Sequence, residues 1–63
     1  MKQVLRNLKE LHGEETTLSH LYLKASEIAK SEGKSEIADS LRNSAKECKK
    51  RANEIEMMMK TLE

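Results

Sequence analysis

The sequence contains no proline and only two glycines in 63 residues, so few positions would interrupt a helix. A single cysteine excludes an internal disulfide, and the CxxC and HExxH patterns of common zinc sites are absent. Tyr22 is the one aromatic residue. No apolar run exceeds three residues, and the N-terminus lacks the apolar stretch of a signal peptide. We therefore expect a cytoplasmic protein with a reduced thiol and no membrane partner.

The two signs of charge are nearly balanced, with 12 basic and 11 acidic residues and a net charge of +1. Such a balance creates no strong field, so we expect no nucleic-acid partner, and we interpret the basic run at 46–51 as a solvated helix face. Charged residues make up 37% of the chain, and helix-forming types dominate. A single domain, 1–63, of this size rarely has a core worth more than about 3–5 kcal/mol, which makes oligomerisation the expected source of stability.

Gly33 marks the expected turn between two helices. It can adopt the left-handed conformation that ends a helix; Ser35 can then cap the next helix, and Glu36 is favourable in its first turn. Gly13 costs about 1 kcal/mol inside a helix but does not have to end it. We predict an all-α fold, a long antiparallel helical hairpin with helices at about 2–32 and 35–62.

Apolar side chains recur with heptad-like spacing through both segments. In the first, two series spaced by seven predict one seam that continues across Gly13: Val4, Leu11, Leu18 and Ala25, and Leu8, Glu15, Tyr22 and Ala29. In the second, the seam is Leu41, Ala45, Cys48, Ala52, Ile55, Met59 and Leu62, with Ile37, Ala38 and Met58 beside it. Two helices cover only one face of each other, so we expect two hairpins to dimerise into a four-helix bundle.

Glu15 occupies a seam position where an apolar side chain would be expected. A buried carboxylate needs a cation, a metal or a hydrogen-bond donor. Glu15 lies 18 residues before Gly33 and Arg51 lies 18 after it, so the hairpin places the two at similar heights, with Cys48 nearby. Three interpretations stay open: a carboxylate at the edge of the stripe, a structural ion pair with Arg51 within or between hairpins, or a metal or catalytic role.

The other polar candidates each have a structural and a functional interpretation. Cys48 fits a small core side chain or, alternatively, a reactive or metal-binding thiol. Tyr22 would need a partner for its hydroxyl if buried, so we predict a buried polar cluster of Glu15, Arg51 and Tyr22. His12, three residues before Glu15, could share a metal site with Glu15 and Cys48.

A longer pattern connects positions 15 and 51. Its residues are Glu15, Tyr22, Ala25, Ser26, Ala29, Glu32, Gly33, Ile37, Ala38, Asp39, Ala45 and Glu47. The pattern resembles one helical-hairpin half of the rubrerythrin branch of ferritin-like proteins. There, a ligand Glu is followed by a Tyr seven residues later, an Ala…Glu-Gly turn, an Ile-Ala-Asp-like helix start and a Glu-x-x-His motif. The resemblance implies a ferritin-like four-helix bundle made of two hairpins.

The same resemblance implies a lost metal centre. Where the family has Glu-x-x-His, this chain has Cys48-Lys49-Lys50-Arg51. A di-iron site takes a Glu and a Glu-x-x-His from each half of the bundle, and only Glu15 is kept. We therefore expect no cofactor and no peroxidase or oxidase chemistry.

We predict a non-catalytic, rubrerythrin-like hairpin that forms a homodimer and acts as a self-associating structural or protein-interaction module. The alternative is a metal-binding or redox protein in which Glu15, Cys48 and His12 bind iron or another transition metal, or in which Cys48 reacts with peroxide. A third hypothesis is an adaptor whose apolar stripe docks on the helices of a larger protein.

Overall fold

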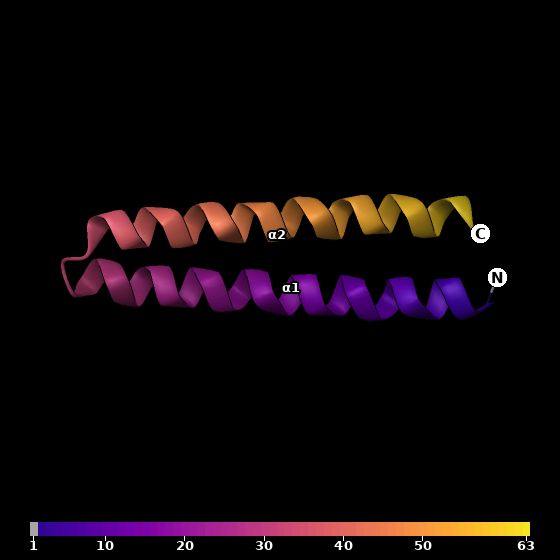
Figure 1. Ribbon diagram of the computed structural model, residues 1–63, viewed down its shortest axis with the longest axis horizontal. Coiled ribbons are helices and arrows are strands. Elements are labelled where there is room, and N and C mark those ends of the chain that lie inside the picture. Colours follow the sequence, from indigo (N-terminus) through magenta and orange to yellow (C-terminus); the bar gives the residue numbers. More distant parts are fainter. Residues whose placement is uncertain (1) are drawn as a thin grey trace.

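The computed structural model describes residues 2–63 as two long helices joined by a tight turn (Figure 1). Helix α1 spans Lys2–Ser31 and helix α2 spans Ser35–Thr61. The helices lie side by side and antiparallel, so the start of α1 and the end of α2 share the end of the rod opposite the turn. The rod measures 48 × 14 × 10 Å. The predicted all-α hairpin is confirmed, with helix ends within one residue of the expected bounds.

The turn is a Schellman motif centred on Gly33. Gly33 has a φ of 77°, in the left-handed region that glycine adopts without a Cβ penalty. Its amide donates to the carbonyl of Lys30 at 3.0 Å, and the amide of Lys34 donates to the carbonyl of Ala29 at 2.8 Å. These two bonds satisfy carbonyls that the end of α1 would otherwise leave without donors. The predicted role of Gly33 is confirmed.

The start of α2 differs from the expectation. The prediction that Ser35 caps this helix is wrong, because Ser35 is already its first helical residue. Lys34 takes the N-cap position, with φ −98° and ψ 68° and no side-chain capping hydrogen bond. The Schellman motif brings the chain into helical geometry one residue earlier than a serine cap would require. Glu36 lies in the first turn of α2, as expected.

Helix α1 continues through Gly13 without a break. A Cβ added at Gly13 would have no heavy atom within 4 Å, so no close packing requires a glycine there. One helix of 30 residues therefore forms despite the local cost of glycine.

The core between the helices is built from small side chains. The buried residues are Ser19, Ser26 and Ala29 of α1 and Ala38, Ala45, Cys48, Ala52 and Ile55 of α2. Ile55 is the one large aliphatic residue among the buried side chains of residues 2–63. Small side chains let two helix backbones approach closely, but they remove little apolar surface from water. The predicted seam of α2 is confirmed in this core, although Ile37 and Met58 beside it are exposed.

The face of α1 that contacts α2 differs from the predicted one at three of the eight predicted positions. Apart from Ala25, which is half-buried as predicted, the buried and half-buried positions form two series spaced by seven: Leu5, His12, Ser19 and Ser26, and Leu8, Glu15, Tyr22 and Ala29. Val4, Leu11 and Leu18, which the prediction placed in the seam, are 50%, 48% and 40% exposed. The polar series replaces them because serine is small enough for close helix packing, which a hydrophobicity pattern does not detect.

Candidate functional site

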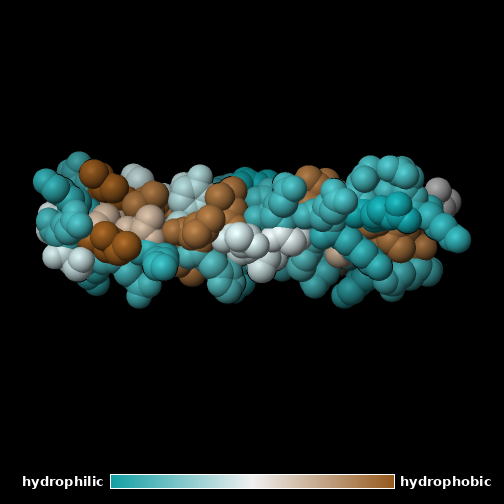
Figure 2. Space-filling view, turned by 90° about the horizontal axis from the view of Figure 1, so that it is seen from below, coloured by the Kyte–Doolittle hydropathy of each residue, from teal (hydrophilic) through white to brown (hydrophobic). Residues whose placement is uncertain are grey.

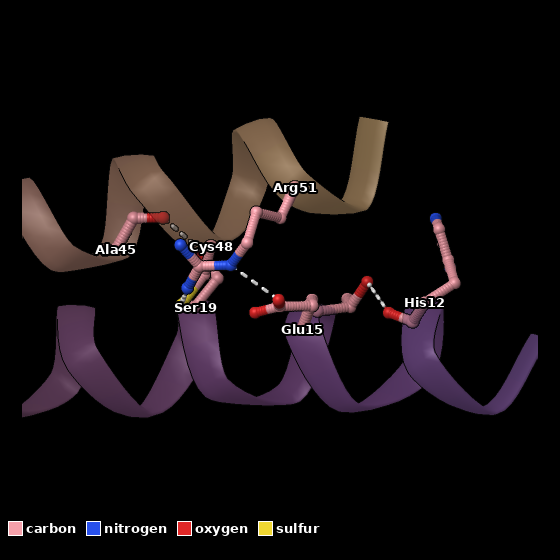
Figure 3. A network of polar contacts seen from close by, with 7 residues as sticks. His12, Glu15, Ser19, Ala45, Cys48 and Arg51 are labelled. Atoms are coloured by element: carbon pink, nitrogen blue, oxygen red, sulfur yellow. Dashed lines mark hydrogen bonds and ion pairs between the residues drawn. The ribbon is translucent and has the colours of Figure 1, made fainter. Parts of the chain in front are cut away.

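A polar cluster crosses the interface between α1 and α2 (Figure 3). The Nε atom of Arg51 donates to Oε2 of Glu15 at 2.6 Å, which links α2 to α1. The Nη2 atom of the same guanidinium donates to Sγ of Cys48 at 3.4 Å, one turn away on α2. The structure therefore brings together Glu15, Arg51 and Cys48, and the ion pair forms within one hairpin.

The three side chains differ in their exposure to solvent. The side chain of Glu15 is 18% exposed and that of Arg51 is 48% exposed, whereas Cys48 is completely buried. Hydrogen bonding and charge attraction from Arg51 lower the pKa of the Glu15 carboxyl, and the same contact raises the pKa of the Arg51 guanidinium. Burial is the main cause that raises the pKa of the Cys48 thiol, with the adjacent Glu15 carboxylate adding to it. The pair is thus ionised at neutral pH, beside a protonated thiol.

The other two predicted residues take separate positions. Nε2 of His12 lies 3.8 Å from Oε1 of Glu56, and His12 lines a groove between the helices to which Arg51 does not contribute. Tyr22 is half-buried one heptad from Glu15. Among residues 2–63, its hydroxyl makes no hydrogen bond with Glu15 or Arg51, so the cluster that forms contains Cys48 in its place.

The donor set of this cluster suits an ion pair better than a metal ion. Within residues 2–63, no group of three or more His, Cys, Asp and Glu side chains lies close enough to hold a metal. Arg51 places a cation against both Glu15 and Cys48. A metal bound by these two residues would have to displace that guanidinium and deprotonate a thiol whose pKa is raised.

The hydrophobicity pattern missed a serine contact that joins the helices. The hydroxyl of Ser19 donates to the backbone carbonyl of Ala45 at 3.3 Å, from a side chain that is 8% exposed. Ser26, 1% exposed, donates instead to the carbonyl of Leu23 in its own helix at 2.7 Å. Both serines belong to the series spaced by seven that begins at Leu5, and this spacing was the available signal.

Most of the exposed large apolar side chains of residues 2–63 lie on one outer face of the hairpin, which we call the apolar face. It comprises Val4, Leu11, Leu18, Leu21 and Ile28 of α1 and Ile37 and Met58 of α2, all at least 40% exposed. Leu11 and Leu18 flank Glu15 along α1, while Ile37, Arg51 and Met58 belong to one heptad series of α2. Because Arg51 reaches Glu15 across the interface, the two stripes lie on the same side.

The ion pair therefore lies in the middle of this apolar face. Figure 2, which views the hairpin from the α1 side, shows hydrophobic groups gathered toward the turn and mostly hydrophilic groups toward the other end. On the other side of the hairpin, a shallow groove between the helices is lined mainly by polar side chains, including His12, Thr16, Lys49 and Asn53, with Leu23 among them. Most of the exposed large apolar side chains therefore lie outside this polar groove.

Comparison of the chain with protein-family models, curated proteins and solved structures gave no match. A two-helix hairpin is common to many helical proteins, so its shape alone assigns the chain to no family. Neither helix within residues 2–63 is long and apolar enough to cross a membrane. The functional argument therefore rests on the contacts and surfaces of this chain.

Proposed function

We propose that the chain is a non-catalytic, self-associating structural module, in which two hairpins pair through their apolar faces to form a four-helix bundle. One observation carries this proposal: within residues 2–63 the fully buried side chains are small apart from Ile55, whereas many of the large apolar side chains are exposed. Among residues 2–63, nine large hydrophobic side chains are exposed, and seven of them belong to the apolar face. A hairpin that functioned alone would be expected to place these side chains between its own helices.

The solvent-accessible area of the hairpin also supports self-association, because it exceeds that of a compact monomer by about the area of one interface. The hairpin exposes 5049 Å², whereas a compact monomer of its 7.2 kDa mass would expose about 4,100 Å². The excess of roughly 900 Å² is close to the ~800 Å² that each partner buries in a protein–protein interface of standard size. Burial of the apolar face against one partner would thus bring the exposed area of each chain into the usual range.

A second copy of the chain is the partner that these features favour. The apolar face contains residues from near both ends of α1, so its length matches that of another hairpin. Pairing by a two-fold axis lets the same patch act on both sides, which is the commonest arrangement in homo-oligomers. The resulting bundle is the arrangement implied by the rubrerythrin-like residues between positions 15 and 51. A cytoplasmic location, where reducing conditions keep Cys48 a thiol, belongs to the same proposal.

Sedimentation equilibrium over a range of concentrations tests this proposal. We expect a dimer with twice the 7.2 kDa mass of the chain, and circular dichroism should show helix content that falls when dilution dissociates the dimer. A stable, fully helical monomer at all concentrations would contradict the proposal. A chain that is unfolded alone at micromolar concentration, and folds only with a different protein, would favour the adaptor hypothesis.

A further inference from the structure

The Glu15–Arg51 pair lies close to the midpoint of both helices. Glu15 comes thirteen residues after the first residue of α1 and sixteen before its last, and Arg51 comes sixteen after the first residue of α2 and ten before its last. When two equal rods pair side by side about a two-fold axis with full overlap, residues near the midpoint lie near the same residues of the other copy. The ion pair of each hairpin would therefore face the ion pair of its partner.

Both members of the pair have unused hydrogen-bonding capacity. A guanidinium carries five N–H donors, of which Nε is used by Glu15 and Nη2 by Cys48. The Arg51 side chain is 48% exposed, so further donors remain accessible from the apolar face. A carboxylate can accept about four hydrogen bonds, and the Glu15 side chain keeps 18% of its surface exposed. Each charge can therefore take a second partner of opposite sign.

Burial of this face makes a second partner necessary. Neighbouring Leu11 and Leu18 would exclude water from the centre of the interface, and charges deprived of water need complete pairing to avoid a large desolvation cost. A second copy supplies the matching carboxylate and guanidinium at the same height.

We propose that Arg51 of each hairpin donates both to its own Glu15 and to Glu15 of the partner subunit, closing a ring of two carboxylates and two guanidiniums at the two-fold axis. This inference rests on the proposed self-association. It adds that the ring of charges determines how the two copies align along their long axes. A shift by one helical turn, about 5.4 Å, would place the charges against leucines. The ring thus selects one register, as isolated buried polar residues do in coiled coils.

Spin labels at the turn can report the alignment. The label is attached to Lys34→Cys, at an exposed position in the turn between the helices, in a Cys48→Ala background used for every protein compared. Pulsed dipolar spectroscopy then measures the distance between the two turns of the dimer. We expect one narrow distance distribution for the parent protein and for the exchanged variant Glu15→Arg/Arg51→Glu, which can rebuild the ring.

The variant Glu15→Leu/Arg51→Met removes the ring while keeping side chains of similar size. We expect it to remain dimeric but to show a broadened distribution or several maxima separated by about one helical turn, 5.4 Å. A dimer of this variant with the same single distance as the parent would overturn the ring and leave self-association intact. A parent protein that is monomeric at every concentration would overturn self-association, and the ring with it.

Discussion

The strongest test of the apolar face is a pair of leucine substitutions matched in exposure. Leu18 lies on the apolar face and is 40% exposed, while Leu23 lies in the polar groove and is 44% exposed. Full burial of a leucine side chain stabilises by about 1.5–3 kcal/mol. The exposed part of Leu18 should therefore contribute about 0.6–1.2 kcal/mol per copy when a partner covers it. A symmetric dimer contains this contact twice, which gives about 1.2–2.4 kcal/mol in total.

At about 1.4 kcal/mol per factor of ten, Leu18→Gln should raise the Kd of the dimer by about 7- to 50-fold. Leu23→Gln should leave the Kd within about twofold of the parent, because its surroundings stay in water. Glutamine and leucine have similar helix propensities, so both variants should keep the helix content of the parent. Sedimentation velocity at several concentrations measures the Kd of each. Equal weakening by both substitutions, or no weakening by Leu18→Gln, would refute the assignment of the face.

Three further predictions concern the turn, the ion pair and the thiol. Gly33→Ala should destabilise the protein by about 1–2 kcal/mol, through backbone strain alone, because its φ is 77° and no atom lies near the added Cβ. Gly13→Ala, in an open helical position, should stabilise by about 0.5–1 kcal/mol; urea unfolding at one fixed chain concentration measures both, and changes of the same sign would contradict the turn geometry. Because Arg51 lowers the pKa of Glu15 in the folded state, the stability from this contact is complete above the ordinary pKa of 4.5 and is lost as the pH falls through the lowered value. The stability difference between the parent and Glu15→Gln should thus shrink below about pH 4.5, and a constant difference down to about pH 3 would show that the contact does not hold in solution. The buried thiol of Cys48, with its raised pKa, should react with iodoacetamide at least ~100-fold more slowly in the native protein than in denaturant; equal rates would instead support the redox alternative.

The sequence predicted the hairpin because the relevant signals are local. Gly33 is the position whose conformation suits a turn, and the absence of proline leaves the flanking segments free to form long helices. Counting residues outward from Gly33 then placed Glu15 beside Arg51, since two antiparallel helices advance by the same rise per residue. Their contact could be derived from the sequence for this reason alone.

The sequence could not show which stripe of α1 faces α2. Leu11 and Leu18 looked like core residues, yet they lie outside, and Ser19 lies inside where it donates to Ala45. A helix with apolar residues on more than one face offers several possible interfaces, and close packing between backbones selects the one with small side chains. Which stripe of α1 faces α2 depends on how the shapes of both helices fit together. The hydrophobicity pattern of α1 alone carries no information on that fit.

The small-residue core has a consequence for how the chain would persist in a cell. Alanines, serines and one thiol give the hairpin its shape but little of the apolar burial that holds a fold together. When association supplies most of the stability, each tenfold dilution of a dimer removes about 1.4 kcal/mol of it. Such a protein has no single melting temperature, because the value moves with the amount of chain present. At chain concentrations above the Kd of the dimer, association keeps the chains folded. At lower concentrations the chains unfold and become substrates for proteases. Abundance itself would then decide whether the fold exists.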